Sequence, residues 1–134
     1  MLRIVLALLL IGHGVIHTGF VSPRPPATAG GPPWPFSFDR SWILSTAGFD
    51  DGVARLVGIA LVATTIGALA FAALASIGVF PMSVWPASTG VGAAASLVLL
   101  IVFFHPWLVA GVAIDVVLLW ATLVARWSPD VLTH

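Results

Sequence analysis

Two histidines near the start of the chain and one distant aspartate carry most of the chemistry that this sequence can offer. His13 and His17 are spaced i, i+4, so in a helix they share one face, a turn apart. Asp115 is the only charged residue in the middle of an apolar stretch, where an unpaired carboxylate is costly to bury. A histidine at the same depth would stabilise this carboxylate, which would in turn orient the imidazole. We therefore predict a contact between Asp115 and His13.

The same residues also fit a metal site. His13, His17 and His105 supply imidazoles, and Asp115 or an aspartate of the loop supplies a carboxylate. This is a workable ligand set for Zn, Cu or Fe. Two histidines on different helices can instead hold a haem axially. The spacing lacks the glutamate of the H-E-x-x-H zinc motif, since positions 14 to 16 read Gly-Val-Ile. A structural His13–Asp115 pair is the alternative, and no catalytic residue is predicted.

The composition shows which elements must position these side chains. Of the 134 residues, 60% are hydrophobic and 7% are charged, whereas a soluble domain carries about 25% charged residues. Apolar stretches long enough to cross a bilayer as helices cover about residues 4–21, 53–80, 87–104 and 107–125. The sequence predicts an all-α integral membrane protein: one domain, residues 1–134, folded as a four-transmembrane-helix bundle.

The connections between these stretches differ in length. A long loop, residues 22–52, holds six of the ten prolines together with glycine and tryptophan. Within it, residues 36–44 are aromatic and amphipathic, which predicts a short interfacial helix. The other connections are short, so the last three helices are expected to be antiparallel neighbours. Small residues four apart, such as Ala63 with Gly67 and Gly92 with Ser96, predict close packing of the second and third helices.

Depth in the bundle supports the predicted pairing. At 1.5 Å per residue, His13 lies about 10 Å and Asp115 about 12 Å below the face that bears the long loop. His105 falls in the turn on that same face. Most of the histidines and aspartates therefore belong to the loop half of the molecule.

The charge balance bears on partners and orientation. A net charge of zero with five scattered arginines excludes a nucleic-acid-binding surface, so the expected partners are the lipid bilayer and other membrane subunits or further copies of the chain. Arginines 3 and 126 flank the spans on the terminal side, and arginines 24, 40 and 55 on the loop side. This count gives no clear orientation, and the basic start favours cytoplasmic termini. The preference for Arg, Ala, Val and Gly is typical of a GC-rich bacterial genome. We therefore expect the chain to lie in the inner membrane of a bacterial cell.

The stretch from Gly12 to Phe20 resembles the start of a diffuse group of small bacterial four-span membrane proteins that open with an H-G-x-x-H-x-x-G-F helix. The architecture is also loosely similar to that of DoxX-like proteins, some of which are subunits or partners of quinone and thiol redox systems. The resemblance marks His13, Gly14 and His17 as the group's recognisable positions and implies no activity. The chain has no cysteine with which to carry out thiol chemistry.

Three functions follow as hypotheses. The first is an accessory or stabilising subunit of a bacterial membrane complex, because the chain is small and lacks a catalytic motif. The second is a metal- or haem-binding redox protein or enzyme that uses the histidines near the loop. The third is a proton or small-solute pathway through Asp115 and His13.

Overall fold

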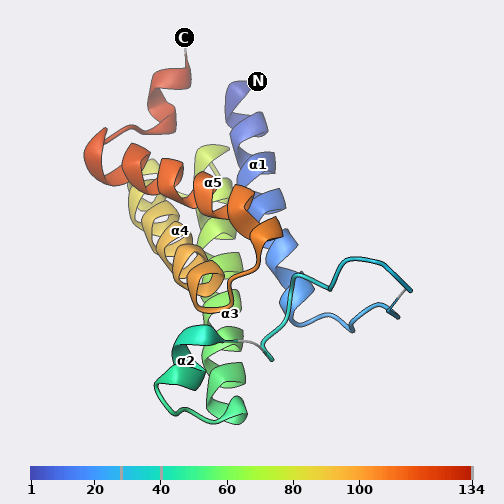
Figure 1. The fold of residues 1–134 in the computed structure, drawn as a ribbon. Helices are drawn as coiled ribbons and strands as arrows, with labels where there is room; N and C mark the ends of the chain where they lie inside the picture. Colours follow the sequence, from blue (N-terminus) through green and yellow to red (C-terminus); the bar gives the residue numbers. More distant parts are fainter. Residues whose placement is uncertain (28, 40, 134) are drawn as a thin grey trace.

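The computed structural model describes residues 1–27, 29–39 and 41–133, and every regular element within these ranges is helical (Figure 1). Arg40, counted above with the arginines of the loop side, lies outside them. The helical segments that are long and apolar enough to cross a membrane are Leu2–Phe20, Asp51–Ser76, Met82–Val102 and Pro106–Val124. They confirm the four predicted apolar helices.

Each long segment is built from one α-helix, in most cases with a tighter or wider turn attached. The first is α1 (Leu2–Ile16), which continues as the 3₁₀ turn η1 (His17–Phe20), and the second is α3 (Asp51–Ser76). The third comprises the 3₁₀ turn η2 (Met82–Val84) and α4 (Trp85–Val102). The fourth comprises η3 (Pro106–Leu108), α5 (Val109–Leu119) and the π-helical turn η4 (Trp120–Val124). A last 3₁₀ turn, η5 (Pro129–Thr133), follows.

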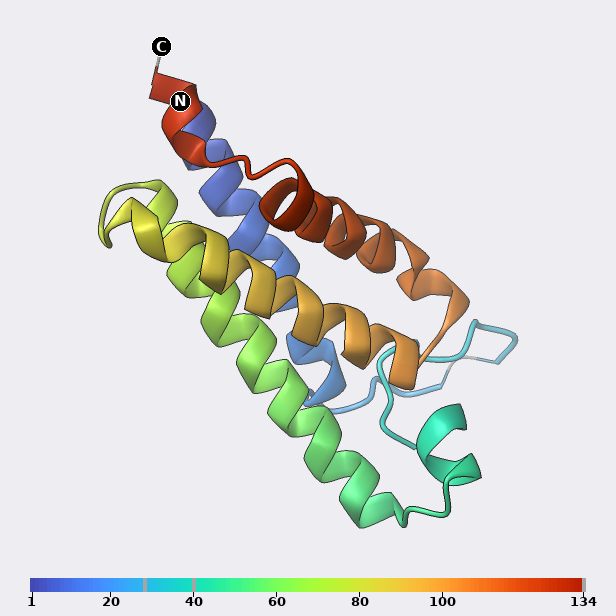
Figure 2. The same ribbon diagram turned by 90° about the vertical axis from the view of Figure 1, so that its left-hand side faces the viewer.

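Helix α3 lies between α1 and α4 in the order of packing. It packs against α1 on one side and α4 on the other, and α5 packs mainly against α4 (Figures 1 and 2). Both termini lie at one end, where Arg3 Nε donates a hydrogen bond to the carbonyl oxygen of Pro129 at 3.1 Å. The long loop and the short helix α2 (Trp42–Thr46) lie at the other end. At that end Asp50 caps α3 by accepting a hydrogen bond from the backbone N–H of Val53 at 2.9 Å.

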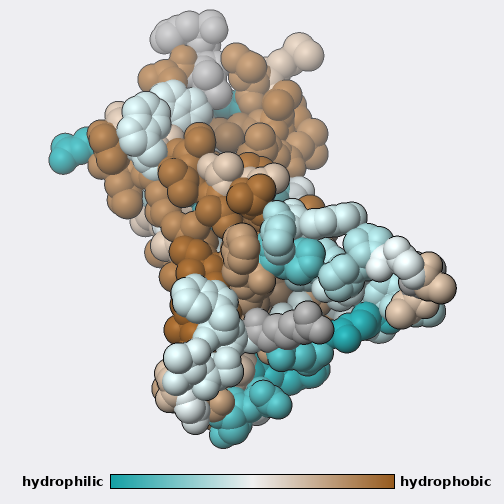
Figure 3. Space-filling model, in the orientation of Figure 1, coloured by the Kyte–Doolittle hydropathy of each residue, from teal (hydrophilic) through white to brown (hydrophobic). Residues whose placement is uncertain are grey.

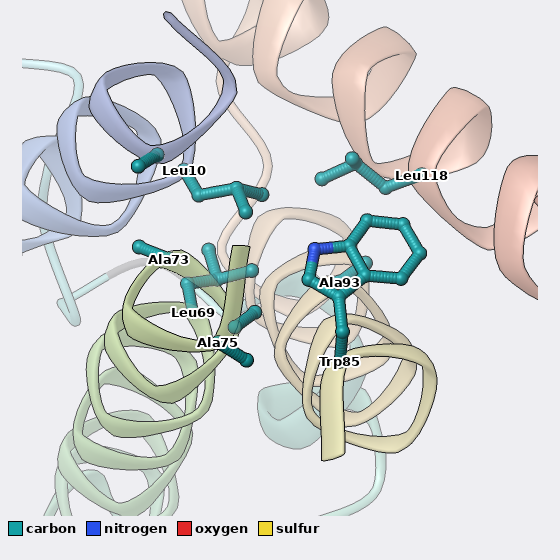
Figure 4. Close-up of a cluster of buried hydrophobic side chains, with 9 residues drawn as sticks. Leu10, Leu69, Ala73, Ala75, Trp85, Ala93 and Leu118 are labelled. Carbon is teal, nitrogen blue, oxygen red and sulfur yellow. The ribbon is translucent and has the colours of Figure 1, made fainter. Parts of the chain in front are cut away.

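Two apolar clusters fill the interior. The cluster nearer the termini contains Leu10, Leu69, Trp85 and Leu118, one or more from each long segment (Figure 4). The cluster nearer the loop combines aliphatic side chains with the aromatic rings of Phe20, Phe38 and Phe103. The two clusters leave the middle of the bundle to polar side chains, which are described below.

The predicted close approach of the second and third long segments occurs at Gly92 of α4. A Cβ atom at this position would lie 2.8 Å from the side chain of Leu69 and 3.2 Å from its backbone nitrogen. Only glycine leaves room for this contact. Gly67 of α3 has no such neighbour within 4 Å of a Cβ, so the spacing of Ala63 and Gly67 does not bring α4 close.

The prediction of an interfacial helix over residues 36–44 is wrong for most of that range. Regular helix begins only at Trp42, after Ser41 accepts a hydrogen bond from the N–H of Leu44 at 3.1 Å. Before it, Phe36 and Phe38 both pack on Phe20, with ring centroids 5.3 Å away in each case. Extended backbone points alternate side chains the same way, whereas a helix would separate them. Packing of both rings on Phe20 thus fits the non-helical backbone of residues 36–39.

The surface divides between the helical body and the loop end. On the face shown in Figure 3, apolar side chains cover the helical body, and polar ones gather over the loop end. Among the exposed apolar residues are Leu56, Val117 and Leu123. Exposed apolar surface of this kind is typical of faces that contact lipid or another protein.

Candidate functional site

Four polar side chains from three helical segments meet in the interior of the bundle. They are His13 on α1, His17 at the start of η1, Ser96 on α4 and Asp115 on α5. Their exposed fractions are 7%, 1%, 0% and 0%, respectively. We call this group the buried network.

The contact between His13 and Asp115 is the one that the sequence predicted. His13 Nε2 lies 2.7 Å from Asp115 Oδ1. The pair joins α1 to α5, which slants across the bundle (Figure 1). Gly14 helps to set this position, since a Cβ there would already be in ordinary contact with Leu69 of α3, at 3.6 Å. The small residue lets α1 approach α3.

Ser96 links this pair to the second histidine. Its Oγ lies 2.5 Å from the other carboxylate oxygen, Asp115 Oδ2, and 2.8 Å from His17 Nε2. The same hydroxyl is 3.5 Å from His13 Nε2. A single serine hydroxyl thus connects an imidazole of η1 with a carboxylate of α5.

The second histidine is also held by the backbone. His17 Nδ1 lies 2.8 Å from the carbonyl oxygen of His13, one turn earlier. The two imidazole rings stand edge to face, with centroids 5.1 Å apart and an interplanar angle of 88°. Both ring nitrogens of His17 therefore have partners, and its orientation is fixed.

Ser96 belongs to the site although its sequence pattern did not predict it. The sequence marks this residue only as a small side chain four positions from Gly92. The signal available was its place on an apolar helix, six residues before the loop-side end at Val102, and so about 9 Å deep. That depth is close to those of His13 and Asp115. Serine recurs too often in helices for its depth alone to identify a site.

His105 stands apart from the other predicted metal ligands. It lies in the turn between α4 and α5, where its Nδ1 accepts a hydrogen bond from the backbone N–H of Trp107 at 3.2 Å. His105 also lines a cavity of about 250 Å³ under the proline-rich loop, together with Arg24, Trp34 and Phe103 among others. His105 therefore caps a helix at the loop end and does not join the buried network.

The described residues contain no group of three or more histidine, cysteine, aspartate or glutamate side chains arranged to hold a metal ion. In the buried network, Nε2 of His13 faces Asp115 and Nε2 of His17 faces Ser96. A metal that used these atoms would have to displace both partners. The predicted metal or haem site at His13, His17, His105 and Asp115 stays a prediction.

A separate polar cluster lies at the loop end. Arg24 donates to Asp39 Oδ2 at 2.7 Å and to Ser37 Oγ at 2.8 Å, and all three side chains are exposed or half-exposed. The hydrogen bond from Ser37, together with the guanidinium of Arg24, lowers the pKa of Asp39 below its ordinary value. This cluster fastens the start of the loop to its later part.

The arrangement of the buried network defines what it can do chemically. It can hold and relay protons between a carboxylate and two imidazoles, since each contact joins a titratable group to a hydrogen-bonding neighbour. Comparison of the chain with protein-family models, curated proteins and solved structures finds no match. The fold and the site together define a small all-helical protein with four apolar helices of membrane-spanning length and a polar network at its centre.

Proposed function

We propose that this chain is a multi-pass protein of the bacterial inner membrane that serves as an accessory or stabilising subunit of a membrane complex. The observation that carries the proposal is the closure of the buried network. His13, His17, Ser96 and Asp115 contact one another and are at most 7% exposed. Polar groups that bond to one another inside the bundle hold the helices together and are not presented to a substrate.

The outer surface of the helices supports the same proposal. Each long segment has one most apolar stretch, and between 22% and 44% of the residues in that stretch are buried within the chain. The remainder needs lipid or other membrane-spanning helices as neighbours. A bundle fixed from inside by interhelical hydrogen bonds, and apolar outside, suits a subunit that packs beside larger partners.

Purification of the untagged chain from its source membranes into lipid nanodiscs tests this proposal. We expect an assembly heavier than one chain by light scattering, with the same second polypeptide in fixed ratio across preparations. Deletion of the gene should lower the amount of that polypeptide in the membrane, and the wild-type chain should restore it. A monomer in lipid, with no membrane protein changed in amount by the deletion, would refute the proposal.

A metal- or haem-binding redox function is the second candidate, and one observation favours it. The fold brings together three of the four predicted ligands, since His13 contacts Asp115 and its ring lies 5.1 Å from that of His17. The proton or small-solute pathway through Asp115 and His13 stays a prediction.

Elemental analysis of the purified protein separates this candidate from the first. If it holds, wild type and His105→Ala carry near one equivalent of copper, iron or zinc, and His13→Ala carries none. Iron would then call for an absorption spectrum to detect haem. Absence of metal from wild-type protein grown and purified with each metal supplied would refute it.

A further inference from the structure

The hydrogen atoms of the buried network can be counted from its donor and acceptor types. His17 Nδ1 lies 2.8 Å from the carbonyl oxygen of His13. A carbonyl oxygen only accepts, so Nδ1 of His17 carries a hydrogen. A neutral imidazole has one N–H, so a neutral His17 offers only a lone pair at Nε2.

The other close contacts of the network each need one hydrogen. They join His13 Nε2 to Asp115 Oδ1 at 2.7 Å, Ser96 Oγ to Asp115 Oδ2 at 2.5 Å, and Ser96 Oγ to His17 Nε2 at 2.8 Å. With Asp115 ionised and both histidines neutral, His13 supplies one hydrogen and the hydroxyl of Ser96 supplies another. One contact of Ser96 would then set lone pair against lone pair in a buried site, which carries the penalty of an unmade hydrogen bond.

One additional proton removes this mismatch, and it can be bound either by His17 or by Asp115. On His17, it makes Nε2 a donor to Ser96, which in turn donates to the carboxylate of Asp115. On Asp115, it makes Oδ2 a donor to Ser96, which in turn donates to His17 Nε2. The two arrangements differ only by a shift of protons through Ser96.

Net charge favours the same proton count. With the additional proton the network is neutral overall, whereas without it the network carries an uncompensated negative charge in an apolar interior. The neighbouring helices offer no compensation within the described residues. Helix α4 has no ionisable side chain, and those of α3, Asp51 and Arg55, lie in its first two turns at the loop end. In α1 the remaining charged residue is Arg3, at the terminal end.

We infer that the buried network is a proton-binding site. The folded bundle holds one proton beyond those of two neutral imidazoles and a carboxylate, and shares it among His17, Ser96 and Asp115. At about pH 8 the unfolded chain has neutral histidines and ionised aspartates. Folding therefore takes up one proton in this range. The equilibrium constant for unfolding should rise about tenfold per pH unit, so stability is lost as the pH rises.

The variant Asp115→Asn tests the inference because an amide imitates the protonated carboxyl. Its NH₂ can donate to Ser96, its oxygen can accept from His13, and Ser96 can then donate to a neutral His17. The network is complete without the additional proton. We expect unfolding in mixed detergent–lipid micelles to lose the tenfold dependence per pH unit that wild type shows above pH 7. Asp130→Asn, at the terminal end, should keep the wild-type dependence.

Spectroscopy of the wild-type protein in lipid bilayers gives a second readout that does not require a variant to fold. Nitrogen-15 NMR distinguishes a doubly protonated His17 from a neutral one, and infrared absorption detects a protonated carboxyl group. Either signal at neutral pH supports the inference. Two neutral histidines together with an ionised Asp115 would overturn it, as would an unchanged pH dependence in folded Asp115→Asn.

Discussion

His13 Nε2 and Asp115 Oδ1 lie 2.7 Å apart inside the bundle, although 102 positions separate these residues in the sequence. Their contact joins the first long segment to the last, which otherwise touch mainly through the helices between them. A hydrogen bond between helices in an apolar medium is worth about 0.6 kcal/mol on average and about 1.7 kcal/mol at most. We expect the buried pair to lie at the strong end of this range, because it joins an imidazole to a carboxyl group at 2.7 Å.

A double-mutant cycle measures this coupling. Combining His13→Ala with Asp115→Ala, we expect a coupling energy of about 1.7 kcal/mol in the free energy of unfolding. The matched cycle of His105→Ala with Asp115→Ala should give a value near zero, because His105 lies outside the network. The measurement is unfolding in mixed micelles followed by circular dichroism. Equal coupling in the two cycles would contradict the contact.

The approach of α3 to α4 gives a second prediction. Gly92→Ala should destabilise the fold by about 1–3 kcal/mol, because the new methyl group overlaps with the side chain and backbone of Leu69. Gly67→Ala is the control, since nothing lies within 4 Å of a Cβ there. That change should stabilise the helix slightly through its higher helix propensity. Thermal unfolding of both variants in the same detergent measures these two changes in stability.

A buried hydroxyl on α3 gives a third prediction. Thr65 is fully buried and its Oγ1 has no hydrogen-bond partner among the described residues. Valine has nearly the same shape, so Thr65→Val should raise the free energy of unfolding by about 1 kcal/mol. Thr122→Val should bring a smaller gain or a loss, because Thr122 Oγ1 already donates to the carbonyl oxygen of Leu118 at 2.8 Å. A loss of stability in Thr65→Val would show that its hydroxyl is bonded.

The loop-end cluster predicts a local pH effect. The hydrogen bond from Ser37 is the first cause of the lowered pKa of Asp39, so Ser37→Ala should raise this pKa toward its ordinary value. Because the folded-state pKa is lowered, the ion pair with Arg24 stabilises the loop above the ordinary range of aspartate. That contribution is lost as the pH falls through the folded-state pKa. NMR titration of the Asp39 carboxyl measures the shift, with Ser45→Ala as a control that should leave it unchanged.

Much of the architecture could be predicted from the sequence. Four apolar stretches of sufficient length allow only helices in lipid, because every backbone polar group must be satisfied within its own segment. An even number of helices places both termini at one end, as Arg3 and Pro129 show. Depth along each helix follows from a fixed rise per residue. This geometry sufficed to predict the pairing of His13 with Asp115.

What depth could not supply is rotation about each helix axis and the course of the loop. His105 and His17 both lie toward the loop end, yet only His17 belongs to the buried network, where its Nδ1 bonds the carbonyl oxygen of His13. Ser96 faces the network because Gly92, one turn earlier, contacts α3 and so fixes which side of α4 is buried. The sequence by itself determined the helices, their lengths and the depth of each polar residue. Only the packing of α1 and α4 against α3, and of α5 against α4, decided which polar residues face one another. Side-chain direction depends on contacts between helices and not on position along one of them.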